Sequence, residues 1–474
     1  MRRERTFWTG QADVAPVALY RIVFGLLAMN WFWQLLPDLT AFYTDEGMFP
    51  RSSQVTYFPL HFTVLNVAGD TWQVALLWLA SLIAAGALAA GFRSRTAAFV
   101  TFAMMASFSL RNPMVGDASD QVFRASALWL GFSAAGDRFS VDAWLRARRG
   151  DPPSGLGWAL PIRIIELQFA WIYLATGLEK MGGGLWRDGL AVFYSLQLEH
   201  TFARPWAAPL GRNVDLARIA TELTLAVELA FLPLAFLPYL RRAGRLVALV
   251  SAAGLHLSIL AFMNVGNFPL VMLAGLIPFL PPAWVHAFAA KIRLPARGAT
   301  GGGVAPRVGW PRRAGGIALA LVALTIFSTA LPAYAAVSRP SGVDRVLQYA
   351  DLTQKWNMFA PDPPTADGWM HIPALLANGT RVDLVTGGPP SDAPRYADPL
   401  YSRWTKVTEW IASKANADYR PEYSRMYCRM RNLHLRQGES PIVSFDLVYY
   451  ERSVPPPGDA PIPIRVFALN AHRC

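Results

Sequence analysis

The segment 171–189, WIYLATGLEKMGGGLWRDG, places polar side chains that could transfer protons at the end of an apolar helix. Lys180 is the leading candidate for a catalytic base, because a lysine partly removed from water binds its proton less tightly and can act near neutral pH. Tyr173 and Glu166 precede it at helical spacing, so we expect all three on one face. The alternative is a lysine that extends to the lipid headgroups and pairs with Glu179.

Two other apolar segments carry polar residues that could complete a site around Lys180. These residues are Glu222 and Glu228 in 217–238, His256 in 244–263, and Asn264 and Asn267 directly after it. Ionisable groups inside membrane spans are costly and usually face a cavity or a partner, so we expect one pocket that opens toward the outer surface. In the alternative interpretation, His256 is a hydrogen-bonded packing residue, and Tyr173 and Trp186 belong to an interfacial aromatic belt.

The composition indicates a membrane protein. Of the 474 residues, 53% are hydrophobic and only 16% are charged, whereas soluble domains have roughly 25% charged residues. The net charge of +12 comes from short basic groups between apolar runs, which is typical of cytoplasmic loops. No aromatic-basic motif is present, so we expect the lipid bilayer and not nucleic acid as the partner.

The apolar runs predict an all-α polytopic membrane domain over residues 1–337, with about nine spans. The predicted spans are 16–36, 72–91, 96–111, 120–136, 160–180, 217–238, 244–263, 268–289 and 314–337. The positive-inside rule places the N-terminus and the Gly/Pro-rich linker 290–313 in the cytoplasm. We expect the first helix to be retained, because no small-residue cleavage site follows it.

An odd number of spans places residues 338–474 outside, as a small extracytoplasmic α+β domain attached to the cell (inner) membrane. Segments 399–414 and 423–436 have helical patterns, and 440–454 and 462–472 alternate as strands do. Cys428 and Cys474 both lie there, so a disulfide is expected, with two free thiols as the alternative. The chain has no Cys/His cluster, and we predict no metal.

Two aromatic connections on the same side could cover the pocket. The segment 181–216 is too polar to span, and its pattern at 190–198 suits a short helix in the outer interface. The aromatic loop 37–71 would lie beside it. Together they could form a lid through which an amphiphile enters from the membrane.

Several motifs, in this order along the chain, resemble those of the HTTM domain, the membrane region of vitamin K-dependent gamma-carboxylase. The signature Y-x-x-x-G-x-x-K followed by W-x-x-G is similar to IYLATGLEKMGGGLWRDG, with Tyr173, Gly177, Lys180 and Trp186 at the matching positions. The other resembling segments are YRIVFGLLA, FYTDEGMFPR, LRNPMVGDASD, DRFSVDAWL, LHLSILAFMNVGNFPLVML and WNMFAPDPP. The resemblance covers most of the chain and is that of a bacterial HTTM protein.

The resemblance implies a quinol-dependent carboxylase, a lyase that uses reduced vitamin K or menaquinol with O2 and CO2. In that reaction, quinol oxidation to the epoxide generates a base that removes the γ-proton of a glutamate in a secreted protein. Lys180 would deprotonate the quinol, with His256 assisting and Glu166, Tyr173, Trp186 and Asn264 lining the quinone pocket.

Two departures from the animal enzyme keep a second function open. No histidine stands near Ser119 and Asp120, where the animal enzyme has one that assists it, and the C-terminal domain is small. The second function is a non-carboxylating HTTM protein that binds a quinone, a lipid or a partner protein. A transporter would need inverted repeats and broken helices, and the sequence indicates neither.

Overall fold

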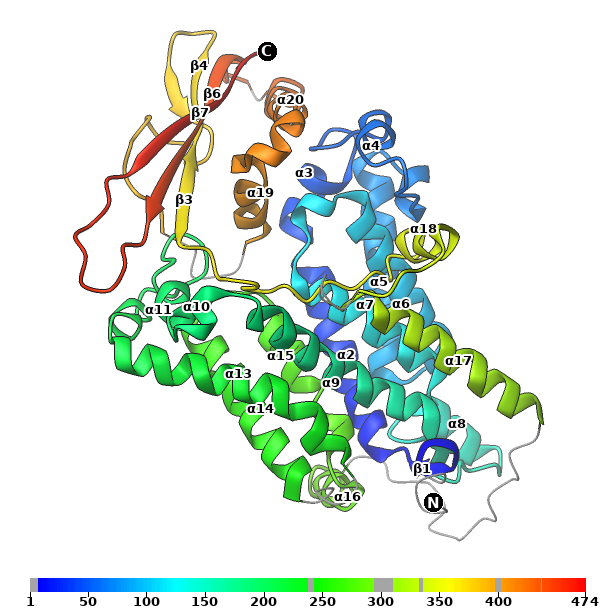
Figure 1. Ribbon diagram of the computed structural model, residues 1–474. Helices are drawn as coiled ribbons and strands as arrows, with labels where there is room; N and C mark the ends of the chain where they lie inside the picture. The colour runs from blue at the N-terminus through cyan, green and yellow to red at the C-terminus, as the bar shows by residue number, and fades with distance from the viewer. Residues whose placement is uncertain (1–6, 238–242, 294–309, 332–335, 397–401, 436) are drawn as a thin grey trace.

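The computed structural model describes residues 7–237, 243–293, 310–331, 336–396, 402–435 and 437–474 (Figure 1). The described chain is a helical bundle followed by a C-terminal sheet domain. The longer bundle helices are α2 (Ala15–Trp33), α5 (Thr71–Ala90), α6 (Ser94–Arg111), α7 (Ala118–Phe132), α8 (Val141–Arg148), α9 (Ala159–Met181), α13 (Val214–Phe236), α14 (Ala243–Phe262), α16 (Pro282–Lys291) and α17 (Trp310–Ser328). The short elements are β1 (Gln11–Asp13), α3 (Leu39–Tyr43), α4 (Arg51–Tyr57), β2 (Leu156–Trp158), α10 (Gly184–Arg187), α11 (Ala191–Ser195), α12 (Ala208–Gly211), α15 (Phe268–Ala274) and α18 (Ser341–Tyr349).

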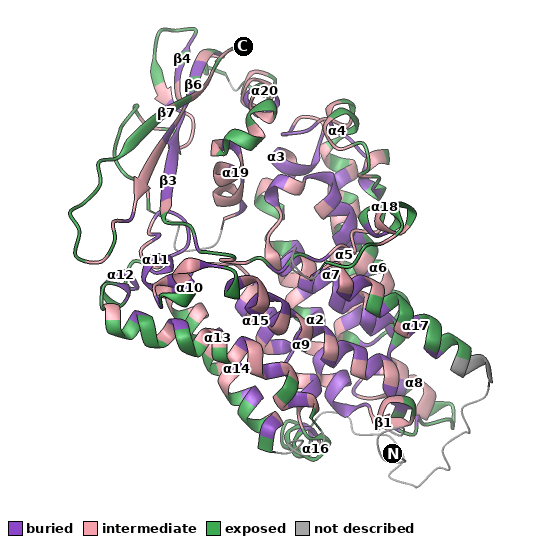
Figure 2. Cartoon of the chain, viewed as in Figure 1, coloured by how far each residue is buried: buried purple, intermediate pink, exposed green. Residues whose placement is uncertain are grey.

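Among the described residues, five helical segments are long and apolar enough to cross a membrane. They begin at Ala15, Thr71, Ala159, Val214 and Ala243. The segments starting at α2 and α9 are 61% and 72% buried, whereas those of α5, α13 and α14 are at most 22% buried. Helices α2 and α9 therefore form the centre of the bundle, and the other three present apolar faces outward (Figure 2).

Helices occur at all nine predicted positions, but a count of nine spans is not confirmed. Helix α7 has 15 residues and reaches about 22 Å, less than the ~30 Å hydrocarbon core. Helix α6 carries Arg95 and Arg111 and packs against α7 inside the bundle. The apolar stretch of α17 is also short, Ala314–Ser328. The N-in orientation stays a prediction, and most of the linker 290–313 lies outside the described residues.

The segment 268–289 is a broken helix and not one continuous span. Residues Phe268–Phe279 and Pro282–Lys291 form two helical pieces at an angle of 110°. Pro281 and Pro282 explain the break, because proline lacks an amide donor and clashes with the preceding turn. The expectation that the chain contains no broken helix is therefore wrong here.

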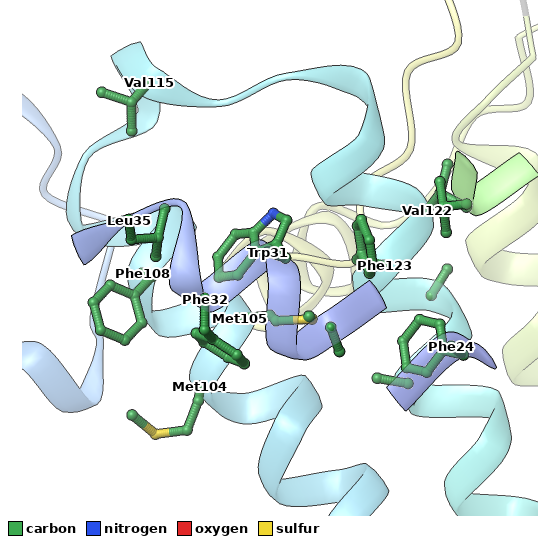
Figure 3. Packing of buried hydrophobic residues seen from close by; sticks show 14 of the residues in the cluster. Phe24, Trp31, Phe32, Leu35, Met104, Met105, Phe108, Val115, Val122 and Phe123 are labelled. Atoms are coloured by element: carbon green, nitrogen blue, oxygen red, sulfur yellow. The ribbon is translucent and has the colours of Figure 1, made fainter. Parts of the chain in front are cut away.

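Large apolar side chains from α2, α6 and α7 interlock at the bundle centre (Figure 3). Trp31 packs edge-on against Phe32, and Phe32 contacts Phe108 at a ring separation of 6.0 Å. On the next turns, Phe24 lies 5.7 Å from Phe123. Lipid is as apolar as these side chains, so close van der Waals packing of the rings, and not their transfer from water, fixes the bundle on which the site is built.

The C-terminal domain is an antiparallel sheet covered by helices, as the α+β prediction states. Its strands are β3 (Ala366–His371), β4 (Pro373–Leu376), β5 (Arg381–Asp383), β6 (Ile442–Ser453) and β7 (Arg465–Arg473), and its helices are α19 (Arg403–Ala412) and α20 (Arg420–Asn432). The long strand β6 pairs with β3 and β4 along one edge and with β7 along the other. The predicted helices and strands of this region are thus confirmed.

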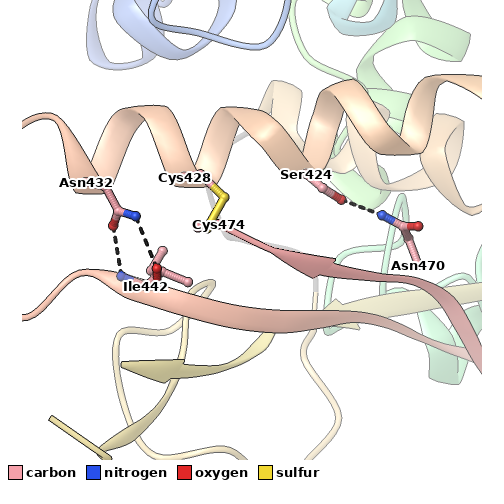
Figure 4. Close-up of a disulfide and its surroundings, with 6 residues drawn as sticks. All are labelled: Ser424, Cys428, Asn432, Ile442, Asn470 and Cys474. Carbon is pink, nitrogen blue, oxygen red and sulfur yellow. Dashed lines mark hydrogen bonds between the residues drawn. A yellow bond between two sulfur atoms is a disulfide. The ribbon is translucent and has the colours of Figure 1, made fainter. Parts of the chain in front are cut away.

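A disulfide joins Cys428 on α20 to Cys474 at the end of β7, which confirms the expected pair (Figure 4). Ser424 and Asn470 add a hydrogen bond of 2.9 Å between the same two elements. Asn432 makes two further bonds to the backbone of Ile442 on β6. Helix α20 is therefore fixed to both long strands of the sheet.

Candidate functional site

A cavity of about 1170 Å³ extends from the bundle interior to the underside of the C-terminal domain. The volume of the whole cavity exceeds the roughly 300–1,000 Å³ that is usual for a small-molecule site. Its inner part is lined by α9, α13, α14 and α15. The walls of the inner part are mainly apolar, including Ile172, Phe262, Phe268 and Met272. A small set of ionisable and hydroxyl-bearing side chains reaches into this apolar space.

Lys180 lies in the inner cavity and forms an ion pair with Glu228 of α13. The distance from Lys180 Nζ to Glu228 Oε1 is 2.6 Å, and both side chains are less than a tenth exposed. Lys180 Nζ also lies 4.4 Å from the centroid of the Trp186 ring, within cation–π range. The alternatives of a lysine at the headgroups and of pairing with Glu179 do not describe this geometry.

Tyr173 and His256 form a second polar pair two helical turns deeper. A hydrogen bond of 2.8 Å joins His256 Nε2 to the Tyr173 hydroxyl, and Phe231 stacks on the tyrosine ring at 4.4 Å. Among the described residues, His256 Nδ1 has no hydrogen-bond partner, and the same holds for Glu228 Oε2. Buried polar atoms normally have partners, so each of these two atoms keeps unused hydrogen-bonding capacity.

The Lys180–Glu228 pair can relocate a proton without changing the total charge of the cavity. An ammonium beside a carboxylate and an amine beside a carboxylic acid are both neutral overall, so burial does not penalise their interconversion as it penalises a lone charge. A ligand hydroxyl near the pair therefore meets an acceptor in either state. This is an arrangement suited to general acid–base chemistry.

The segment 353–364, here called the strap, runs from α18 to β3 along the side of the helical bundle that faces the C-terminal domain (Figure 1). Six of its residues line the cavity. Its Phe359 carbonyl accepts a hydrogen bond of 2.8 Å from Trp186 Nε1. The Asp362 carboxylate accepts from the amides of Gly184 and Leu185 at 3.1 and 2.8 Å. The strap thereby fixes the indole that lies over Lys180, which gives the glycine-rich turn after α9 a structural role.

Gly183 shows why this turn contains glycine. A Cβ at this position would lie 1.9 Å from the Pro361 carbonyl oxygen and 2.4 Å from Asp362 Oδ1. Real Cβ contacts are not that short, so the strap can only lie against the turn because the side chain is missing. At the neighbouring Gly184, a Cβ would meet nothing within 4 Å.

The outer part of the cavity is polar and lies beneath the C-terminal domain. Arg124 bonds to the Asp351 backbone and pairs with its carboxylate at 2.8 Å. Burial raises the pKa of Asp351 and lowers the pKa of His61, so desolvation favours the neutral form of each. Lys355 and Lys406 also line this part.

The structure brings most, but not all, of the predicted site residues together. Lys180, Tyr173, Trp186 and His256 line the cavity, together with Glu228, whose pairing with Lys180 depends on helix packing. Glu222 is exposed on the other side of α13.

Two predicted pocket residues lie elsewhere. Asn264 is next to the cavity but not among its lining residues. The backbone amide of Asn264 donates a hydrogen bond of 2.7 Å to the Phe202 carbonyl. Glu166 lies at the far end of α9, where it pairs with Arg163 and Arg245. Although Glu166 shares the helical face of Lys180, about 21 Å of helix separates the two residues.

The described residues contain no group of three or more His, Cys, Asp or Glu side chains placed to hold a metal ion. The polar groups of the inner cavity are instead a proton-sharing pair, an imidazole and a phenol. Groups of these kinds can form hydrogen bonds with hydroxyl- or carbonyl-bearing ligands.

Together, the apolar helices, the buried ionisable site between them and the C-terminal sheet domain define a helical membrane protein with an internal ligand cavity. The HTTM domain model matches residues 10–284, more than half of the chain. The chain therefore belongs to the HTTM family, whose domain is the membrane region of vitamin K-dependent gamma-carboxylase. No curated protein and no solved structure matches it.

Proposed function

We propose that the protein binds a reduced quinone in the inner cavity and starts its oxidation by removing a hydroxyl proton, as a carboxylase-like membrane enzyme. The observation that carries the proposal is the buried Lys180–Glu228 pair, which lines the apolar inner part of the cavity of about 1170 Å³. The HTTM membership supports the same proposal, and the segment around Lys180 resembles the family's signature motif with its lysine.

The cavity residues fit a quinol in size and in polarity. The aromatic and aliphatic walls suit a ring with a prenyl tail, and the Lys180–Glu228 pair suits its hydroxyl groups. A bound quinol would supply the reducing equivalents that, with O2, give an epoxide and the strong base needed to carboxylate a glutamate with CO2.

This chain's own residues would hold and move the proton. Glu228 keeps Lys180 in place, and the pair accepts a hydroxyl proton without a net charge change in the apolar cavity. Tyr173 and His256 orient the ligand from the deeper side. Trp186, fixed by the strap, covers the Lys180 ammonium and keeps water away from the pair.

Mass spectrometry of the purified protein tests this function. Wild type, Lys180→Ala and the exposed-lysine control Lys414→Ala are each given menaquinol or vitamin K hydroquinone with O2 and bicarbonate. We expect epoxide from wild type and from the control, and at least a hundredfold less from Lys180→Ala. Undiminished epoxide from Lys180→Ala would remove this lysine from the reaction.

A second candidate is a quinone-binding HTTM protein that does not carboxylate. One observation favours it. Asp120 stands near the position of the animal enzyme's assisting histidine, and its carboxylate accepts hydrogen bonds from Trp31 and Arg403. That side chain is used for holding the C-terminal domain. Bound quinone without epoxide, in the experiment above, would select this second function.

A further inference from the structure

A second cavity, of about 390 Å³, lies at the opposite end of α9 from Lys180. It is formed where α2, α9 and α14 begin, beside the broken helix 268–291. Five of its twelve lining residues carry polar side chains, and four of these five are ionisable. The five are Gln11, Asp13, Arg163, Glu166 and Arg245.

One buried carboxylate in this cavity is shared by two arginines. Arg163 Nη1 lies 2.5 Å from Glu166 Oε1, and Arg245 Nη2 lies 3.1 Å from Glu166 Oε2. Glu166 is fully buried, whereas the arginine side chains are 14% and 18% exposed. The three groups together carry a charge of +1, and both arginines line the cavity.

The other acid of the cavity, Asp13, has partners of its own, and the charge of Arg138 offsets that of its carboxylate. His286 Nε2 lies 2.8 Å from Asp13 Oδ2, and the Ala15 amide donates to Oδ1 at 2.8 Å. Arg138 adds a more distant positive charge, 3.8 Å from the same carboxylate. Asp13 therefore does not cancel the excess positive charge of Arg163 and Arg245.

The cavity lies at the end of the bundle that is farthest from the C-terminal sheet, beside β1 and α16 (Figure 1). Trp284 on α16 is 55% exposed at this end, as expected for a residue in the lipid headgroup layer. The end of a membrane-spanning bundle lies at the depth of lipid phosphates, and basic pockets between helices at this depth bind anionic head groups.

We propose that the Arg163–Glu166–Arg245 cluster is a binding site for a phosphate-bearing anion, supplied by an anionic phospholipid head group or by free phosphate. Arginine forks match phosphate oxygens in geometry as well as in charge. The shared Glu166 holds both guanidinium groups in position. When no anion is bound, its negative charge also offsets one of the two positive charges. Apolar lining residues such as Ile162 and Leu280 lie beside the cluster, where the first part of an acyl chain would pack.

Native mass spectrometry of the full chain tests the site by counting retained lipids. The protein is delipidated in detergent and then supplied with phosphatidylglycerol, with phosphatidylcholine or with inorganic phosphate alone. Arg245→Gln lowers the cluster charge to zero and leaves Glu166 its bond to Arg163. Glu166→Gln raises the charge to +2, and Arg95→Gln removes one exposed charge outside the cavity as the matched control.

We expect selective retention of phosphatidylglycerol by wild type, about fivefold weaker retention in Arg245→Gln and stronger retention in Glu166→Gln. The Arg95 control should behave like wild type. If inorganic phosphate displaces the lipid, the site recognises the phosphate itself; if it does not, the lipid is the source. Equal retention of both lipids, together with no phosphate binding, would overturn the proposal, as would wild-type retention in Arg245→Gln.

Discussion

Lys180 on α9 and Glu228 on α13 form a buried ion pair in which Nζ lies 2.6 Å from Oε1. Forty-eight residues separate them in the sequence, and only the packing of the two helices brings them together. The pair is therefore a structural link between the helices as well as the candidate chemical centre.

Glu228→Gln should both destabilise the bundle and abolish quinol oxidation. Removing one partner leaves Lys180 charged and buried, which costs about 3–5 kcal/mol. Thermal melting in detergent checks this cost, with Glu222→Gln, an exposed acid on the same helix, as the control. The double variant Lys180→Met/Glu228→Gln should recover most of the stability but none of the activity. A melting temperature of Glu228→Gln equal to that of wild type would contradict the buried pair.

Gly183→Ala should displace the strap, whereas Gly184→Ala should not. The new methyl group at 183 would overlap the Pro361 carbonyl, and overpacking of this kind costs about 1–3 kcal/mol. Hydrogen exchange of the strap amides measures the effect, and we expect faster exchange in Gly183→Ala only. Identical exchange in the two variants would show that the strap does not depend on the missing side chain.

Arg403→Gln should loosen the C-terminal domain from the bundle. Arg403 makes two bonds of 2.9 Å to Asp120, and both side chains are nearly fully buried. The variant leaves the buried Asp120 carboxylate without its positively charged partner, which costs about 3–5 kcal/mol of stability. Limited proteolysis should then release the domain at lower protease concentration.

Arg425→Gln is the control for that experiment. Arg425 is half-exposed and its partner Glu422 keeps a second ion pair with Arg429, so the loss is at most about 1 kcal/mol. Adding Asp120→Asn to Arg403→Gln should restore part of the resistance. Equal resistance of Arg403→Gln and Arg425→Gln would mean that other contacts hold the domain.

Acidification should weaken the contact between the 197–212 region and strand β3 through His200. Burial lowers the pKa of His200 from its usual value of 6.5, so the folded protein keeps this imidazole neutral while the unfolded chain takes up a proton. The free energy of unfolding is unaffected by protonation of His200 above pH 6.5, and it decreases as the pH falls from 6.5 toward the lowered pKa. Melting temperatures between pH 7.5 and 5 should therefore fall more steeply for wild type than for His200→Gln.

Asp367 changes stability with pH in the opposite direction to His200, so the measurement needs a variant that keeps Asp367. Its carboxylate accepts a hydrogen bond of 2.6 Å from the backbone amide of His200, and burial raises the pKa of Asp367. Protonation of Asp367 on acidification therefore favours the folded state. His200→Gln retains Asp367 and Arg452, so the difference between the two pH profiles reports the imidazole together with its interaction with Asp367. Parallel profiles would exclude a role for His200.

The sequence by itself determined the features that depend on local periodicity. The apolar runs predicted the membrane helices, and the helical repeat placed Lys180 and Tyr173 on one face, where both line the cavity. Alternation predicted strands β6 and β7, and two cysteines in one small domain indicated the disulfide. These features follow from side chains a few residues apart, or from a pairing with a single choice of partner.

Only the tertiary structure decided which distant residues meet. Glu166 and Lys180 share a helical face, yet the length of α9 assigns them to two different cavities. The partner of Lys180 proved to be Glu228 and not the adjacent Glu179, because the rotation and packing of α13 against α9 select which acid is buried. The strap reaches Trp186 across more than 170 residues of sequence. Periodicity reports the direction of a side chain from its own helix, whereas contacts between helices depend on how all of them pack at once.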